Sequence, residues 1–133
     1  MNNKTKKKIK VLLVDDERHI RMIMRKVVES MNLEVAAEAP NGAEAVRLYR
    51  EHRPHMVFMD INMPIMDGKE ALQAIMKEFP KAFIIMVTSL SAMDMVTDCL
   101  IIGAANYIRK DTSLDDLKLH VRESWNEYIK SMR

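Results

Sequence analysis

Five short apolar runs alternate along the chain with segments in which apolar residues recur at helical spacing. The runs cover residues 9–14, 34–39, 55–59, 82–87 and 106–109. The first, third and fourth are nearly continuous in Val, Ile, Leu, Met and Phe, which is typical of strands that a parallel sheet buries on both faces. The pattern therefore predicts five β-strands.

The intervening segments have the 3.6-residue period of amphipathic helices. In the first of them Ile20, either Ile23 or Met24, Val27 and Met31 fall on one face. The last segment repeats apolar residues at intervals of three and four over its whole length, at Leu114, Leu117, Val121, Trp125, Tyr128 and Met132.

Glycine and proline mark the boundaries between these elements. Gly42, Gly68 and Gly103 are placed in connections, where a positive φ costs little at glycine. Pro54 and Pro80 precede the third and fourth strands, where a helix must stop.

Strands that alternate with helices at this spacing predict a doubly wound α/β sandwich with a five-stranded parallel sheet. Right-handed crossovers leave few strand orders, of which 2-1-3-4-5, the flavodoxin-like (βα)5 order, suits five strands. The chain of 133 residues is long enough for one such domain.

Composition narrows the cellular setting. The formal net charge of +2 depends on five lysines within the first ten residues, and the rest of the chain is mildly acidic, which argues against nucleic-acid binding. The apolar run at residues 9–14 is too short for a membrane span or a signal peptide. A single cysteine, Cys99, excludes an internal disulfide and suits a reducing cytoplasm.

Chemistry-bearing residues follow four of the predicted strands. Asp15 and Asp16 come after the first strand, Asp60 after the third, Thr88 at the end of the fourth and Lys110 after the fifth. Because parallel strands in this fold bring their carboxyl ends to one edge, where ligands bind, we expect these side chains to meet there.

Such a set suits a phosphoryl group and a hard cation. Three converging carboxylates repel one another unless a cation lies among them, and all-oxygen ligation favours Mg²⁺ or Mn²⁺. With the ammonium of Lys110 as a second positive charge, the edge could accept a dianionic phosphoryl group, to which Thr88 could donate a hydrogen bond.

Four segments of the chain resemble the receiver (CheY-like) domains of two-component response regulators. They are VLLVDD at 11–16, MDINMPIMDG at 59–68, VTS at 87–89 and GAANYIRK at 103–110. On this resemblance, residues 1–8 form a basic N-terminal arm and residues 9–133 a receiver domain.

The resemblance implies that Asp60 takes a phosphoryl group from a histidine kinase or phosphotransfer protein. It implies Mg²⁺ ligation by Asp15, Asp16, Asp60 and the backbone carbonyl of Asn62, and pairing of Lys110 with the phosphoryl group. Thr88 and Tyr107 would act as the switch that reshapes the face of the fourth helix, fifth strand and fifth helix for a downstream protein partner. The chain would then be a signalling phospho-acceptor and no enzyme beyond its own phosphorylation and slow dephosphorylation.

Two positions distinguish this sequence within the resemblance. Where the family usually has a proline joined by a cis bond, Asp111 follows Lys110. A non-proline cis bond costs roughly 3 kcal/mol, so we expect a trans bond or a locally altered loop here, and Asp111 could compete for the Lys110 ammonium. Leu90, two residues past Thr88, could shield a phosphoaspartate from water and slow its hydrolysis.

Alternative functions remain open from the sequence. A haloacid dehalogenase-type phosphatase would need Asp-x-Asp after the first strand, where this chain has Asp15-Asp16, and a flavodoxin would need a phosphate-binding loop there. The complete set of Asp16, Asp60, Thr88 and Lys110 argues against a binding module that has lost phosphorylation. We expect a stand-alone receiver, with a receiver fragment of a longer DNA-binding regulator as the alternative, and kinase contacts at Arg18, Arg21 and Met22.

Overall fold

The computed structural model describes residues 8–89 and 92–132, and a five-stranded parallel sheet forms its centre. The strands are β1 (Lys10–Val14), β2 (Glu34–Ala39), β3 (Met56–Met59), β4 (Ile84–Thr88) and β5 (Asn106–Arg109). Their spatial order is β2-β1-β3-β4-β5, with every neighbouring pair parallel, as the sequence predicts. The strand bounds differ from the predicted ones by two residues at most, as at β4.

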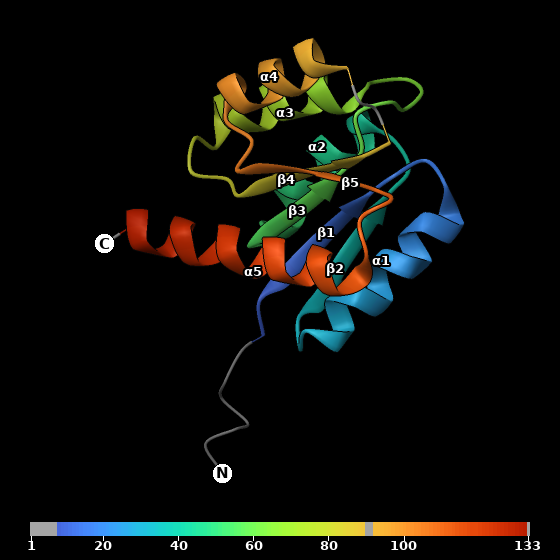
Figure 1. Ribbon diagram of the computed structural model, residues 1–133. Helices are drawn as coiled ribbons and strands as arrows, with labels where there is room; N and C mark the ends of the chain where they lie inside the picture. Colours follow the sequence, from blue (N-terminus) through green and yellow to red (C-terminus); the bar gives the residue numbers. More distant parts are fainter. Residues whose placement is uncertain (1–7, 90–91, 133) are drawn as a thin grey trace.

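Five helices cover the two faces of the sheet (Figure 1). Helices α1 (Arg18–Ser30) and α5 (Leu114–Ser131) lie on one face, and α2 (Gly42–His52), α3 (Gly68–Glu78) and α4 (Met93–Ile102) lie on the other. Within the described residues, none of the helices combines the length and the apolar character that crossing a membrane requires.

Each central strand contributes to two hydrophobic cores, because successive side chains point to opposite faces of the sheet. In β1, Leu12 and Val14 pack under α2, α3 and α4, whereas Val11 and Leu13 pack under α1 and α5. All of these side chains are at least 98% buried. Burial on both faces explains why the runs of β1, β3 and β4 are continuously apolar.

The helices turn their apolar faces to the sheet; in α1 the structure selects one of the two predicted alternatives, and at α5 two predicted positions are exposed. In α1 the core residue is Met24, and Ile23 is 44% exposed. In α5, Leu117 and Val121 are buried, but Leu114 is 51% exposed, and Met132, which the prediction included in the helix, follows its last residue and is 48% exposed, so neither lies on the packed face. Leu114 is the first residue of α5 and Met132 directly follows its last residue, so both stand at the ends of the helix.

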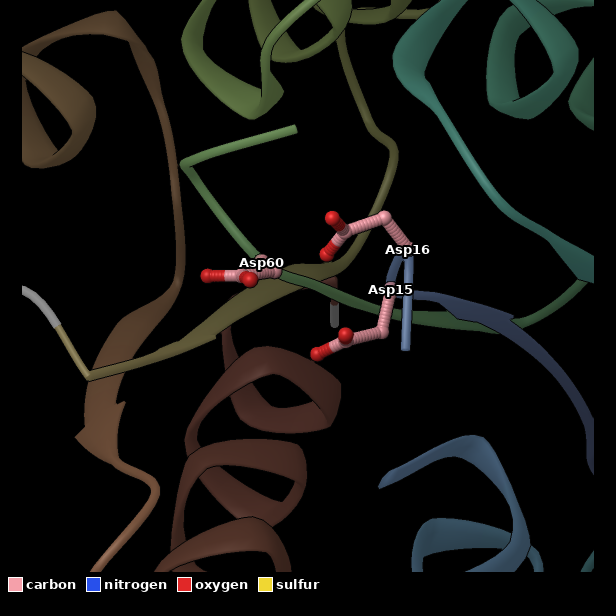
Figure 2. A group of neighbouring side chains, drawn as sticks. All are labelled: Asp15, Asp16 and Asp60. Carbon is pink, nitrogen blue, oxygen red and sulfur yellow. The ribbon is translucent and has the colours of Figure 1, made fainter. Parts of the chain in front are cut away.

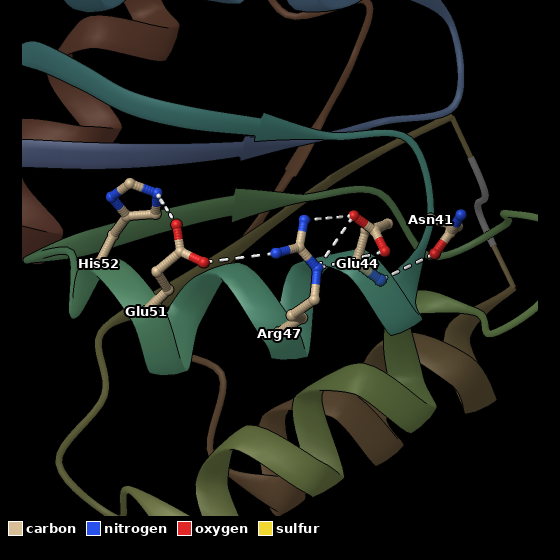
Figure 3. A network of polar contacts seen from close by, with 5 residues as sticks. All are labelled: Asn41, Glu44, Arg47, Glu51 and His52. Carbon is tan, nitrogen blue, oxygen red and sulfur yellow. Dashed lines mark hydrogen bonds and ion pairs between the residues drawn. The ribbon is translucent and has the colours of Figure 1, made fainter.

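The start of α2 is fixed by a side-chain cap, and its outer surface carries a chain of ion pairs (Figure 3). Asn41 accepts a hydrogen bond from the Glu44 amide at 2.9 Å, which satisfies one of the unpaired donors of the first turn. Arg47 pairs with Glu44 at 2.7 Å and with Glu51 at 3.3 Å. These exposed pairs add little stability, so the cap is the contact that determines where α2 begins.

Two leucines of α5 provide a test of this packing. We expect Leu117→Ala to lower the free energy of unfolding by about 2–4 kcal/mol, because it leaves a cavity against the sheet. Leu114→Ala, the same change at an exposed position, should cost less than about 0.5 kcal/mol. Urea denaturation of both variants measures the difference, and equal losses would contradict the assignment of the packed face.

Candidate functional site

Two buried aspartates follow neighbouring strands at the carboxyl edge of the sheet. The Asp15 amide donates to the Ala39 carbonyl at 3.0 Å, and the Asp60 amide donates to the Val14 carbonyl at 3.0 Å. The hydrogen-bond ladders of the parallel sheet therefore continue one residue beyond β1 and β3. They hold the backbones of Asp15 and Asp60 side by side. Asp15 is 4% and Asp60 is 5% exposed.

Lys110 supplies the positive charge between these two carboxylates. Its Nζ lies 2.7 Å from Asp15 Oδ2 and 2.9 Å from Asp60 Oδ2, and 3.9 Å from an oxygen of Glu17. Lys110 follows β5, two strands away from β3, and its amide donates to the Thr88 carbonyl at 3.0 Å. This bond sets the starting point from which the side chain reaches Asp60.

Burial and hydrogen bonding shift the pKa of Lys110 in opposite directions, and the same holds for Asp15. Burial lowers the pKa of Lys110, but its hydrogen bonds to Asp15 and Asp60 outweigh that effect and leave the pKa raised. The stability that the ammonium contributes is therefore fully present below pH 10.5 and is lost only as the pH rises through the higher folded pKa. Burial raises the pKa of Asp15, and the Lys110 hydrogen bond reduces this rise without cancelling it.

Three carboxylates form a group with the chemistry of a divalent-cation site. Oxygens of Asp15, Asp16 and Asp60 lie within 4.8 Å of one another. Figure 2 shows all three side chains gathered at the ends of the two strands. Two of them are buried and one is exposed, so a cation could enter from solvent, and hard oxygen donors suit Mg²⁺ or Mn²⁺. Asn62 lies exposed two residues after Asp60, and ligation by its carbonyl stays a prediction.

Close backbone contacts position the loop between β3 and α3. The Ile61 amide donates to Asp60 Oδ1 at 2.8 Å, and the Gly68 amide donates to the Ile61 carbonyl at 2.7 Å. A Cβ atom at Gly68 would collide with the Asp60 carbonyl and lie 2.8 Å from Ile61 Cα. Glycine is thus required at position 68 because the first turn of α3 packs directly against the backbone of Asp60, which leaves no room for a side chain.

The glycine predictions need a correction at two of three positions. Among the glycines, only Gly103 has a positive φ, at 136°. Gly42 and Gly68 are the first residues of α2 and α3 instead of connection residues. Gly42 donates its amide to the Met66 carbonyl at 2.8 Å, and a Cβ there would lie 2.6 Å from that oxygen. Both glycines allow helix starts to pack against the loop that follows Asp60.

The predicted switch residues, Thr88 and Tyr107, belong to β4 and β5. Thr88 is completely buried at the end of β4, and Tyr107 is half-buried in β5, paired with Met86. Their roles in a switch stay predictions. Leu90 lies outside the described residues.

Asp111 does not compete for the Lys110 ammonium. Its carboxylate pairs with the Arg109 guanidinium through two bonds of 3.0 Å each. The peptide bond between Lys110 and Asp111 is trans, as predicted, and Lys110 still reaches Asp60. The additional carboxylate nearest to the ammonium is Glu17, which the sequence interpretation missed although it directly follows the Asp15-Asp16 pair.

The predicted kinase contacts differ in their surroundings. Arg18 and Met22 are exposed on α1, whereas the Arg21 side chain is only 16% exposed and is bonded within the molecule. Contact of these residues with a kinase stays a prediction.

Removal of the ammonium should expose the repulsion between the aspartates. Without added metal, we expect Lys110→Met to lose roughly 2–4 kcal/mol of unfolding free energy, because two buried carboxylates lose their shared partner. Mg²⁺ should then raise the melting temperature of this variant more than that of the wild type. Lys69→Met, which breaks a half-buried pair with Asp98, is the matched control and should lose about 1 kcal/mol or less. Thermal unfolding with and without Mg²⁺ decides, and an equal Mg²⁺ response in all three proteins would refute the electrostatic account.

Gly68→Ala should reverse the usual sign of a helix substitution. Alanine in a helix is favoured over glycine by about 1 kcal/mol, but here the added methyl meets the backbone of Asp60 and Ile61. We expect a net loss of about 2 kcal/mol or more, measured by urea denaturation. A gain in stability would show that the close approach is absent.

Comparison with known proteins agrees with this arrangement. The family model described as "Response regulator receiver domain" matches residues 11–122. A "Chemotaxis protein CheY" from Listeria monocytogenes is 42% identical over 80% of this chain and 90% of its own, and one from Bacillus subtilis is 38% identical over 88% and 98%. A structure of the CheX-CheY-BeF3-Mg complex from Borrelia burgdorferi superposes with a TM-score of 0.87 at 31% identity, covering 94% of this chain and 95% of its own. The chain belongs to the CheY-like receiver domains of two-component response regulators.

Proposed function

We propose that this receiver accepts a phosphoryl group on Asp60 from a phosphohistidine of a histidine kinase or phosphotransfer protein. The observation that carries the proposal is the buried Asp60 carboxylate, held 2.9 Å from the Lys110 ammonium beside two further aspartates. The membership in the receiver family and the similarity to a CheY crystallised with BeF3 and Mg support it.

The two oxygens of Asp60 have different surroundings. Oδ1 accepts the Ile61 amide at 2.8 Å, and Oδ2 lies against Lys110. In the proposed transfer, a carboxylate oxygen forms a bond to phosphorus while the bond from phosphorus to the histidine nitrogen breaks, and the imidazole retains the electron pair and takes up a proton. A Mg²⁺ ion held by Asp15, Asp16 and Asp60, with the Asn62 carbonyl, would neutralise charge on the phosphoryl oxygens.

Lys110 would neutralise the same developing charge from the opposite side. It can do so only if it exchanges its contact with Asp60 for one with a phosphoryl oxygen, while its backbone stays fixed to Thr88. The Thr88 hydroxyl would donate a hydrogen bond to the same group.

The signal would leave through the surface of α4, β5 and α5. Movement of Thr88 toward the phosphoryl group would let Tyr107 change its burial, and a downstream protein partner would read the altered face. Similarity to chemotaxis CheY proteins supports a chemotaxis-type or phosphorelay role in the cytoplasm. The chain would act as a phospho-acceptor, with no catalysis beyond its own phosphorylation and slow dephosphorylation.

Substitution of Asp60 tests the acceptor assignment. Incubated with acetyl phosphate and Mg²⁺, the wild type should gain the mass of one phosphoryl group, and hydroxylamine should remove it. Asp60→Asn should gain none, because an amide is a poor nucleophile. Asp115→Asn, at an exposed aspartate in the first turn of α5, is the control and should behave like the wild type. Intact-protein mass spectrometry reads the outcome, and a Mg²⁺-dependent acylphosphate on Asp60→Asn would falsify the assignment.

A further inference from the structure

The guanidinium of Arg21 joins two segments that flank the acidic group. Nη1 donates to the backbone carbonyl of Asp15 at 2.7 Å, and Nε donates to Glu38 Oε1 at 2.9 Å. Arg21 belongs to α1 and Glu38 to β2, so one planar group connects a helix, an edge strand and the loop after β1.

Glu38 is itself held in place by a second arginine. Its Oε2 accepts bonds from Arg25 Nη2 at 2.7 Å and Nε at 3.0 Å. Burial raises the pKa of Glu38, but the hydrogen bonds from Arg25 and Arg21 outweigh it and hold the pKa below its usual range. Glu38 therefore stays ionised and provides a rigid anchor for Arg21.

The carbonyl that Arg21 holds belongs to the peptide unit between Asp15 and Asp16. The Asp15 amide is fixed to Ala39 at 3.0 Å, and Asp15 Oδ1 accepts the Glu17 amide at 2.9 Å. The Arg21 bond adds control over the orientation of the peptide plane that leads to Asp16, because a peptide unit is planar. That orientation fixes the direction in which the backbone of Asp16 leaves Asp15, and with it the base from which the exposed carboxylate of Asp16 reaches the two buried ones.

We propose that Arg21 is a positioning residue for the divalent-cation site, acting through the peptide between Asp15 and Asp16. The proposal rests on the proposed Mg²⁺-dependent function. Groups that orient metal ligands from outside the coordination shell typically change metal affinity by roughly 10–100-fold when altered. The two arginines that bind Glu38 differ in their other contacts. Arg21 also donates to the Asp15 carbonyl, whereas Arg25 also pairs with Glu29.

This difference supplies a matched pair of variants. Arg21→Lys keeps the charge but cannot reach Glu38 and the Asp15 carbonyl together, because a single ammonium replaces the fork of the guanidinium. Arg25→Lys weakens the same Glu38 anchor without touching the loop after β1. By isothermal titration calorimetry with MgCl₂, we expect the Kd of Arg21→Lys to rise roughly tenfold and that of Arg25→Lys to rise much less, because Arg25→Lys loosens Glu38 but leaves the bond from Arg21 to Asp15.

A second measurement separates positioning from general destabilisation. At low Mg²⁺, Arg21→Lys should be phosphorylated by acetyl phosphate more slowly than the wild type, and at saturating Mg²⁺ its rate should recover. Urea unfolding without Mg²⁺ verifies that both variants are folded at the titration temperature. Should Arg21→Lys be unfolded there, Glu38→Gln serves in its place and should show a smaller rise in Kd, because it weakens the anchor of Arg21 and leaves the bond to Asp15.

The outcomes distinguish this inference from the function on which it rests. Equal Mg²⁺ affinity in the wild type and Arg21→Lys overturns the role of Arg21 and leaves the proposed function intact. An equal rise in Kd for both lysine variants shows that Arg21 acts through general stability, which also overturns the proposal. A wild type that binds no Mg²⁺ removes the proposed function itself, and the role of Arg21 with it.

Discussion

The structure depends on the ammonium of Lys110 between two buried carboxylates. Asp15 and Asp60 are brought together by the ladders of β1, β2 and β3, and the ammonium offsets the repulsion between these two buried carboxylates. Lys110 directly follows β5, the edge strand beyond β4, so its bond to Asp60 also connects this edge of the sheet to the central strand β3. Any cation or phosphoryl group that enters must be accommodated by rearranging this one contact.

Much of the fold and of the site composition follows from local pattern. Continuous apolar runs identified the strands buried on both faces, and the alternation of strands and helices predicted the order β2-β1-β3-β4-β5. The carboxyl ends of parallel strands share an edge, so the sequence alone predicts that Asp15, Asp60 and Lys110 lie together, as they do in the structure. Such predictions succeed because they need only chain direction and strand order.

Contacts that depend on the detailed geometry of loops were beyond the reach of these patterns. Asp111 could have faced Lys110 or Arg109, and only the geometry of the loop shows that it pairs with Arg109. Gly68 was interpreted through its conformational freedom, whereas its contact with the Asp60 carbonyl explains its presence. The bond from Arg21 to Asp15 has no counterpart in sequence spacing, because the acceptor is a backbone oxygen.

The aromatic cluster that Trp125 and Tyr128 of α5 form with Phe83 has a consequence for spectroscopy. Trp125, the single tryptophan, stacks on Tyr128 at 5.2 Å and meets the edge of Phe83 at 5.1 Å. Tyr128 donates its hydroxyl to the Lys81 carbonyl at 2.6 Å, near the amino end of β4 and thus at the pole of the sheet away from the aspartates. Intrinsic fluorescence therefore reports the packing of the second half of α5 and is not quenched directly by ions at the acidic edge. Trp125 emission and the Mg²⁺-dependent melting temperature would report on opposite ends of one sheet. If both signals change at the same temperature, the two ends unfold cooperatively.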